Sequence, residues 1–505
     1  MKKSRFVWLL SLLVILALAL AACGGSTAEP AADSSASSDT AVEEAAPAEE
    51  AAPSEAAAPA EEAAVPTEEA MPVEEPADTA ASADGPIEIR WFIGLGAGGN
   101  PEEIEKENAF AEKFNAAYGD QYKLVLDIVQ NETAYDVLKT QIASGDVPDI
   151  VGPVGVRGMY SFEGAWLDMS PFIEAANMDL TDFNPALVEF YQFEGQGQVG
   201  LPFAVYPSAL WYNKDLFDEA GLEYPPHEWG APYADGSEWN FDKLRELAMI
   251  LTVDANGNDA TMDGFDPDNT VQFGYHPMWT DIRGQWTFFG AGSFADADGN
   301  AVMPEVWREA AHWAYDAMWT DHFWPNDNYV NSDLLAQGNT FGSGNVAMNP
   351  NHTWYTCCFE GVNWDVAAIP SYNGNMTAKL HADTFGIMKA TKNPEAAFAV
   401  YSLFMGEFAP DLVEIYGAFP GRTSLQESAM AKMAESYPDA DLQVFVDALN
   451  YPDNPNHESG MPNFLKASDV YGTFGALYQS TPDLDLDAEI DKLIGELQTV
   501  FDEVK

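Results

Sequence analysis

The chain has 505 residues, and its 81 Asp and Glu against 22 Lys and Arg give a formal net charge of −59 at pH 7. An acid excess this large repels phosphate backbones and anionic lipid head groups, which excludes nucleic acid and argues against a lipid surface as partners. The chain has three cysteines and lacks the paired CxxC spacing of a zinc site.

The N-terminus has the parts of an export signal. Basic residues at positions 2, 3 and 5 precede an apolar run over 6–22, which is too short to favour a permanent membrane helix. The run ends in Ala-Ala before Cys23, which resembles the lipobox of bacterial lipoproteins. That resemblance implies a signal peptide over 1–22, cleavage before Cys23 and acylation of its thiol. An ordinary secretory signal followed by a chance cysteine is the alternative.

Residues 23–84 have the composition of a tether. They consist mostly of Ala, Glu, Pro, Ser and Thr, and positions 26–84 contain 16 acidic residues and no Lys or Arg. Such a segment buries too little apolar surface to offset the loss of chain entropy, so we expect it to be disordered. Its prolines and like charges extend it, and its predicted role is to hold a folded part away from a membrane.

The folded part is predicted to begin at residue 85 and to alternate strands with helices. In order, the patterns indicate a strand over 87–93, a Gly-rich turn, a helix from 101, a strand over 123–129, a helix over 135–142 and a strand ending at 151. This order predicts a mostly parallel sheet with helices on both faces. The pattern resumes after residue 201, and a chain of about 420 residues usually divides into two domains.

The Gly-rich turn has the spacing Gly94-x-Gly96-x-x-Gly99, which formally matches a dinucleotide fingerprint. We discount that interpretation because an exported protein has no supply of nicotinamide cofactor and Asp127 lies too far along the chain. No cofactor is therefore expected. The glycines would instead let a ligand approach the backbone.

A second motif places Asp254, Asn256 and Asn258 at alternate positions, which half-resembles a calcium loop. The glycine is at the fourth place and the twelfth place is Phe265, so a turn is the favoured interpretation and a metal site a weak alternative. The sequence contains neither GxSxG, HExxH nor a phosphate loop, so we do not expect an enzyme.

Tryptophan is used 14 times, and several copies stand in polar, Gly-rich surroundings. Aromatic faces stack on the C–H faces of sugars, while Asp, Asn and His grip hydroxyl groups. Single tryptophans usually belong to a core, but clusters beside polar residues raise the probability of a ligand platform. The clusters are Trp211-Tyr212, Trp279 with Asp281, Trp286, and Trp354-Tyr355 after Asn349, Asn351 and His352.

Six segments, taken in order, resemble the extracellular solute-binding proteins of bacterial ABC transporters, in particular the carbohydrate-binding group that includes maltose-binding protein. They are the segments 145–151, 164–169, 200–204, 210–217, 344–348 and 392–397. The resemblance implies an α/β, two-lobed periplasmic-binding-protein-like fold of type II, in which each lobe is a sheet flanked by helices and a multi-crossing hinge joins them. Hinge closure would enclose the ligand.

Matching to the family places the crossings near 205–207, 364–365 and 403–404. It implies a first lobe over 85–206 plus 365–404, and a second over 207–364 plus 405–505. Ligand contacts are expected from Trp91, Gly94, Gly96, Tyr206, Trp279, Asp281, Trp286, Asn351, Trp354, His381, Asp383 and Arg422. The adjacent Cys357 and Cys358 raise the hypothesis of a vicinal disulfide beside the cleft.

The resemblance implies a monomeric, non-catalytic receptor that is anchored to the outer face of the cytoplasmic membrane through lipidated Cys23. Its expected partners are a carbohydrate ligand, a sugar or oligosaccharide, and the permease subunits of an ABC transporter. The same fold binding another polar solute, such as a polyamine or a polyol phosphate, is the first alternative. A secreted carbohydrate-active enzyme and a regulatory sensor domain are further alternatives.

Overall fold

The computed structural model describes residues 85–359 and 361–505, and of Cys357 the backbone only. The predicted signal peptide, the lipid attachment at Cys23 and the tether lie outside these residues. Within the described residues, no single helix is long and apolar enough to cross a membrane. Two consecutive helices, Pro394–Met405 and Ala409–Ile415, meet that test only when they are taken together, and they are bent by 72° relative to one another.

One main sheet organises the described chain, with strand order β2-β1-β3-β11-β6-β9-β8-β7, and β10 and β12 added to β6. The strands are β1 (Ile87–Ile93), β2 (Tyr122–Ile128), β3 (Ile150–Gly155), β6 (Ala204–Asn213), β7 (Val253–Asp254), β8 (Thr270–Tyr275), β9 (Val346–His352), β10 (Trp364–Ala367), β11 (Leu380–Ile387) and β12 (Phe419–Pro420). A separate hairpin pairs β4 (Gln192–Phe193) with β5 (Gly197–Gln198).

The first lobe is the part of the molecule built around β1, β2 and β3. These strands are parallel, as the β-α-β-α-β order predicts. The surrounding helices are α2 (Pro101–Tyr118), α3 (Asn131–Ser144), α4 (Val156–Ser161), α5 (Ser170–Ala175), α6 (Pro185–Glu189), α12 (Pro394–Met405) and α13 (Ala409–Ile415). Trp91, Phe110, Phe385 and Phe404 form an aromatic core between strands and helices.

The second lobe is built around β7–β10 and the C-terminal half of β6. Its helices are α7 (Lys214–Ala220), α8 (Phe241–Ile250), α9 (Ile282–Trp286), α10 (Glu305–Trp319), α11 (Asp327–Val330), α15 (Gln443–Ala448), α16 (Phe464–Ser480) and α17 (Leu486–Asp502). The long helices α10, α16 and α17 bury one apolar face each, through residues such as Trp307, Tyr478 and Leu497. The remaining helix, α14 (Thr423–Ser436), contacts β12.

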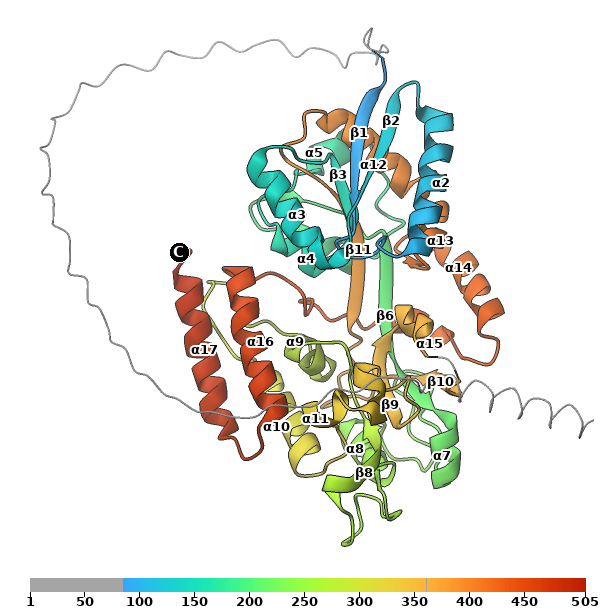
Figure 1. The fold of residues 1–505 in the computed structure, drawn as a ribbon, viewed down its shortest axis with the longest axis vertical. Coiled ribbons are helices and arrows are strands. Elements are labelled where there is room, and N and C mark those ends of the chain that lie inside the picture. Colours follow the sequence, from blue (N-terminus) through green and yellow to red (C-terminus); the bar gives the residue numbers. More distant parts are fainter. Residues whose placement is uncertain (1–84, 360) are drawn as a thin grey trace, which may run out of the picture. The chain divides into compact units, whose positions relative to one another are not determined.

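Strands β6 and β11 connect the two lobes (Figure 1). The N-terminal half of β6 pairs with β11 through Ala204–Pro207, and its C-terminal half pairs with β9 through Ser208–Tyr212. β11 in turn pairs with β6 at its start and with β3 at its end. β6 therefore belongs to both lobes. β11 follows a segment that pairs with the second lobe, at Ser371 with Asn240, and it then enters the first lobe, so these two strands form the hinge of the molecule.

The predicted crossing near 205–207 falls within β6, in the part that pairs with β11. Trp364 and Asp365, where a second crossing was expected, belong to β10, which pairs with β6 inside the second lobe. The chain crosses later, along β11. Leu403 and Phe404, where a third crossing was expected, lie inside α12. Both positions were taken from matching to the family, which gives approximate positions along the chain and no strand partners.

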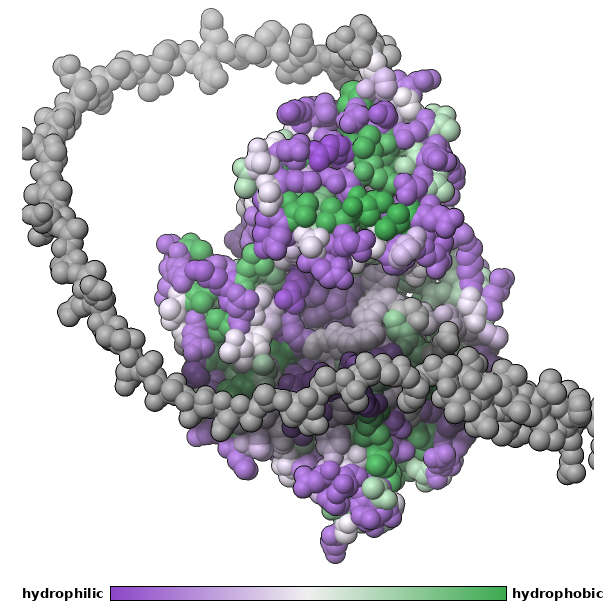
Figure 2. Space-filling model, viewed as in Figure 1, coloured by the Kyte–Doolittle hydropathy of each residue, from purple (hydrophilic) through white to green (hydrophobic). Residues whose placement is uncertain are grey.

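Hydrophilic residues dominate the face shown in Figure 2, in keeping with the acidic composition. Exposed charge of one sign favours solubility and disfavours association with other acidic surfaces.

Candidate functional site

A cavity of about 590 Å³ lies where the loop after β1, strands β6 and β11 and the segment after β9 meet. Both lobes and both hinge strands contribute to it. Its lining consists of Gly96, Ala97, Asn100, Glu103, Tyr206, Trp354, Thr356, His381, Asp383, Tyr416, Gly417 and Tyr437. Polar and aromatic side chains together make this a site for a polar molecule with apolar faces.

The loop between β1 and α2 forms one wall. Gly94 has φ +126°, and a Cβ atom there would stand 1.9 Å from the Val129 carbonyl oxygen, so only glycine fits. The Asn100 side chain caps α2 by accepting from the Glu103 backbone N–H at 2.9 Å. Glu103 in turn accepts from the Gly98 N–H at 2.9 Å, which holds its carboxylate at the cavity wall.

An aromatic platform forms the opposite wall. Trp354 lies in the short 3-10 helix η4 (Thr353–Cys357) directly after β9, where it is half-buried. Its ring is parallel to that of Trp279, with centroids 5.8 Å apart and planes 10° apart. Trp279 is 48% exposed and has φ +54°, a conformation that is costly for a large side chain. Backbone strain at an exposed aromatic residue is a feature that clusters at ligand-binding sites, and aromatic faces offer apolar surfaces to a ligand.

Buried polar atoms without a hydrogen-bond partner in the protein gather just before Trp354. They are Asn349 Nδ2, Asn351 Nδ2, His352 Nε2 and Thr353 Oγ1. The ring of His352 donates through Nδ1 to the Tyr206 carbonyl oxygen at 2.6 Å, because a carbonyl can only accept. This tautomer leaves Nε2 as an acceptor. Burial lowers the pKa of His352, which keeps the ring neutral. Buried polar atoms without a hydrogen-bond partner are rare in folded proteins, so a group of them in one segment calls for a functional or structural explanation.

Strand β11 contributes His381 and Asp383 to the cavity floor. Burial raises the pKa of Asp383 to about 7, although His381 opposes the shift. Near neutral pH this carboxyl group can therefore either donate or accept a hydrogen bond.

Tyr416 completes the lining, and a buried carboxyl group behind the wall positions it. Its hydroxyl donates to Glu107 Oε1 at 2.9 Å. Burial raises the pKa of Glu107 to about 7, against the effect of the Tyr416 hydrogen bond. Neither Tyr416 nor Glu107 was predicted from the sequence. In the sequence, Glu107 is one of several acidic residues in a predicted helix.

Behind His381, a cluster of charged side chains comes from the loop between α15 and α16. Glu458 Oε2 lies 3.4 Å from His381 Nδ1, and it accepts from the Arg157 backbone N–H at 3.4 Å. His457 Nδ1 lies 2.6 Å from Asp453 Oδ2. These loop residues were not predicted, and the only sequence signal is a polar stretch, Asp453-Asn-Pro-Asn-His-Glu458, between two helices.

Two basic groups balance this cluster. Arg157, on α4 of the first lobe, lies 3.6 Å from Asp281, on the second lobe. Lys379 is buried, and its ammonium group lies 5.3 Å from the centre of the Phe288 ring. Burial lowers the pKa of Lys379 to about 8, while Asp281, Asp453 and Glu458 oppose the shift. The Arg157–Asp281 pair is a direct polar contact between the lobes.

The structure brings several predicted residues together and leaves others apart. Gly96, Tyr206, Trp354, His381 and Asp383 line the cavity. Trp279 stacks on that lining, Asp281 caps α9 by accepting from the Gly284 N–H, and the Asn351 side chain is buried in β9. Gly94 lies behind the wall, against Val129.

Three further predicted residues have structural roles away from the cavity. Trp91 and Trp286 are fully buried in the cores of the first and second lobes. Arg422 pairs with Asp182 at 2.7 Å and donates to the Met405 carbonyl oxygen, so its guanidinium group is engaged within the protein.

The loop at Asp254 has the geometry of a turn. Its carboxylate accepts from the backbone N–H groups of Asn256, Asn258 and Asp266 at 2.8–3.0 Å. Backbone donors thus satisfy the charge that a calcium ion would otherwise satisfy. Of the cysteine pair, Cys358 is disulfide-bonded, and the side chain of Cys357 lies outside the described atoms.

Comparisons with known proteins agree with this architecture. The family model for bacterial extracellular solute-binding proteins matches residues 98–404, more than half of the chain. A Brucella abortus (strain 2308) protein named only as a binding protein is 25% identical over 258 residues, which is 50% of this chain and 56% of that protein. The chain thus spans about half the length of the curated relatives it matches.

Solved structures share the fold. UspC of M. tuberculosis aligns with TM-score 0.60 and 20% identity, covering 83% of this chain and 100% of that one. The sugar-binding protein MalE of Xanthomonas citri gives 0.62 and 17%, covering 82% and 98%. An ABC substrate-binding protein from Listeria monocytogenes, in complex with cycloalternan, gives 0.61 and 19%, covering 83% and 98%. This likeness confirms the predicted two-lobed α/β fold.

Proposed function

Because the chain belongs to the bacterial extracellular solute-binding protein family, we propose that its solute is a sugar or oligosaccharide, bound in the cavity between the lobes. The observation that carries the proposal is the stacked pair of Trp354 and Trp279: Trp354 lines the cavity together with carboxyl, imidazole and phenol groups, and Trp279 packs against it. Sugars present apolar C–H faces and a rim of hydroxyl groups, and this arrangement matches both.

Three further features support a carbohydrate. The side chains of Asn349 and Asn351, whose buried Nδ2 atoms have no hydrogen-bond partner in the described protein, lie in the strand that leads into Trp354. Among similar structures, one is described as a sugar-binding protein and another is in complex with cycloalternan. A hinge of two shared strands, β6 and β11, suits closure around such a ligand.

We further propose a place in the cell envelope. Cys23 would carry the lipid, the acidic segment 23–84 would tether the receptor to the outer face of the cytoplasmic membrane, and the closed monomer would deliver its ligand to an ABC permease. A non-catalytic receptor needs no cofactor. Globomycin treatment of cells, followed by mass determination of the protein, tests the lipid: unprocessed precursor should accumulate.

A polyamine is the second candidate solute. The cavity lining contains the two carboxyl groups of Glu103 and Asp383, which would pair with ammonium groups. Carboxyl groups in a cavity also accept hydrogen bonds from sugar hydroxyl groups, so a binding experiment with both classes of solute separates the two candidates.

A thermal-shift screen of the purified full chain separates these candidates. The panel contains monosaccharides, linear and cyclic oligosaccharides, spermidine and polyol phosphates, and glycoside turnover is recorded in parallel. A ligand present at 100 times its Kd stabilises the fold by about 2.7 kcal/mol, which raises the melting temperature measurably. A shift with a carbohydrate supports the proposal; a shift with spermidine or phosphates alone, or turnover of glycosides, contradicts it.

A further inference from the structure

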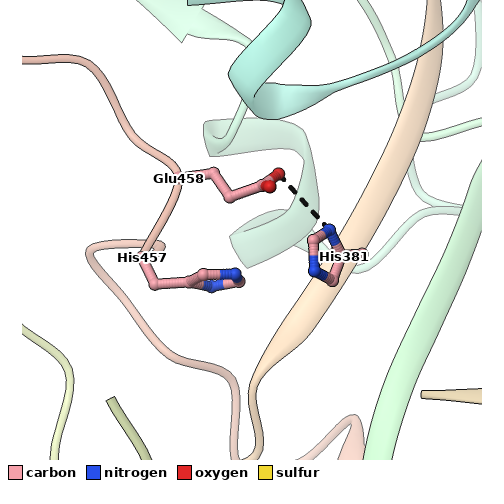
Figure 3. A group of neighbouring side chains, drawn as sticks. All are labelled: His381, His457 and Glu458. Carbon is pink, nitrogen blue, oxygen red and sulfur yellow. Dashed lines mark ion pairs between the residues drawn. The ribbon is translucent and has the colours of Figure 1, made fainter. Parts of the chain in front are cut away.

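Three side chains behind the cavity point toward a common space (Figure 3). His381 comes from β11, and the adjacent His457 and Glu458 come from the loop between α15 and α16. One ligand atom from each, two imidazole nitrogens and a carboxylate oxygen, lie within 4.8 Å of one another. Ligands of a tetrahedral zinc ion lie about 3.4 Å apart, so small side-chain rotations would bring the three atoms into coordinating distance.

His457 is held in the tautomer that a metal requires. Its Nδ1 lies 2.6 Å from Asp453 Oδ2, and the carboxylate can only accept, so Nδ1 carries the proton and Nε2 has a free lone pair. Asp453 is fully buried and also accepts from the N–H groups of His457 and Leu380. A carboxylate behind a ligating imidazole is the usual outer partner of a metal-bound histidine.

A second observation concerns a buried imidazole nitrogen next to these three residues, which has no hydrogen-bond partner in the described protein. The ring of His352 packs edge-on against His381, with centroids 4.2 Å apart. His352 is 1% exposed, and its Nε2 has no hydrogen-bond partner in the protein. The ring pair His381–His457 is also edge-on, at 5.0 Å. Three histidines of the seven in the chain thus meet at one point.

From this geometry we propose that His381, His457 and Glu458 bind a divalent cation of the zinc class, oriented by Asp453. The donor set decides the class of ion: two imidazoles and one carboxylate suit zinc and its neighbours, whereas calcium and magnesium require oxygen ligands. Glu458 supplies the single carboxylate of the set, and its charge interacts with the nearby Arg157 and Lys379.

Such an ion ties hinge strand β11 to the C-terminal segment. Three protein ligands leave a tetrahedral ion with one open position, which water or an oxygen atom of a cavity molecule can fill. His381 also lines the cavity, so the ion is bound next to the solute. The proposal does not depend on whether that solute is a sugar.

The test is calorimetric titration of the metal-free full chain with Zn²⁺. We expect one ion per chain, and at least ~100-fold weaker binding in His381→Ala and Glu458→Gln. Asp453→Asn is expected to weaken binding by about 10–100-fold. The matched control is His312→Ala, which removes a histidine from α10 that pairs only with Asp487, and it should bind as the unaltered chain does.

Two spectroscopic measurements distinguish loss of the metal site from misfolding of a variant. Co²⁺ added to the metal-free protein should give the intense visible absorption of a four-coordinate site, and circular dichroism of each variant reports its folding. The proposal is overturned if zinc does not bind stoichiometrically. It is equally overturned if a folded His381→Ala variant binds as tightly as the His312→Ala control, which would show adventitious binding to surface carboxylates.

Discussion

Asp383 lines the cavity, and its carboxyl group has a raised pKa. It lies on β11 and is held among His381, Gly155 and the charge of Glu458. Burial raises its pKa to about 7 in the folded protein, whereas an aspartate in an unfolded chain has a pKa near ~3.9. Folding therefore favours the protonated form of this residue.

The sign of the resulting pH dependence follows from linkage. Between pH 4 and 7 the folded state binds more protons at Asp383 than the unfolded state does, so this residue lowers the unfolding free energy as pH rises through that window. We expect Asp383→Asn to remove the effect. We compare the unfolding free energy of the variant with that of the unaltered chain at each pH. This difference should increase by about 1–2 kcal/mol between pH 4.5 and 8. The expected increase is smaller than the full pKa shift implies, because the carboxyl group is partly exposed to the cavity.

Urea unfolding at the two pH values measures this difference. Because both proteins keep every other titrating group, including Glu107, the subtraction isolates Asp383. A difference that stays constant with pH would mean that the carboxyl group titrates normally in the folded state.

At the residue scale, the sequence could identify Trp354 and Tyr206 but could not separate them from Trp91 and Trp286. All four are aromatic residues next to predicted strands or turns. What distinguishes them is whether each ring borders the cavity or is enclosed in the core of a lobe, and that depends on long-range packing such as the pairing of β11 with both β3 and β6. Glu458 and His457 were missed for the same reason, since 76 residues separate His457 from its spatial neighbour His381.

The turn between β1 and α2 is the element on which the cavity wall depends. At Gly94, both the φ of +126° and the 1.9 Å approach of a Cβ atom to Val129 O forbid a side chain. We expect Gly94→Ala to lower the unfolding free energy by more than about 3 kcal/mol, because it combines conformational strain with a clash against backbone.

The matched control for this turn is Gly145→Ala at the end of α3. Gly145 has φ +76°, but no atom lies within 4 Å of its added Cβ, so only conformational strain of about 1–2 kcal/mol is expected. Urea midpoints of both variants test the comparison. Equal losses would show that the backbone approach at Val129 is relieved without cost.

At the element scale, the local patterns of the first lobe predicted well. The strands over 87–93 and 123–129 and the helix after the Gly-rich turn match β1, β2 and α2 within one residue. The predicted α/β, two-lobed class and the family are confirmed. The hinge was predicted less well, because a strand that connects two lobes, as β11 does, has the same alternation as one that belongs to a single lobe.

For the whole molecule, the net charge of −59 predicts self-repulsion in the folded state. Raising NaCl from 10 to 150 mM shortens the screening length from about 30 to 8 Å. We expect the unfolding free energy at pH 8 to rise by about 1 kcal/mol over this range, because screened repulsion outweighs the weakened surface ion pairs. The same salt series near pH 4, where carboxyl groups approach neutrality, serves as the control and should show a smaller effect.

Urea unfolding at several salt concentrations gives the result directly. Lower stability at the higher salt concentration would show that ion pairs such as Arg308 with Asp487 and Asp491 contribute more than the repulsion does.

The central claim is that Trp354 provides the platform on which a carbohydrate binds between the lobes. The measurement that tests it most directly is calorimetric titration of the full chain, Trp354→Ala and Trp319→Ala with the carbohydrate that gives the largest thermal shift. Trp319 is a half-buried tryptophan at the end of α10, outside the cavity lining, and serves as the matched control. We predict a loss of about 2 kcal/mol, or roughly 30-fold in Kd, for Trp354→Ala and no change in affinity for Trp319→Ala. Unchanged affinity in a folded Trp354→Ala variant, or the absence of any carbohydrate that binds, would contradict the account.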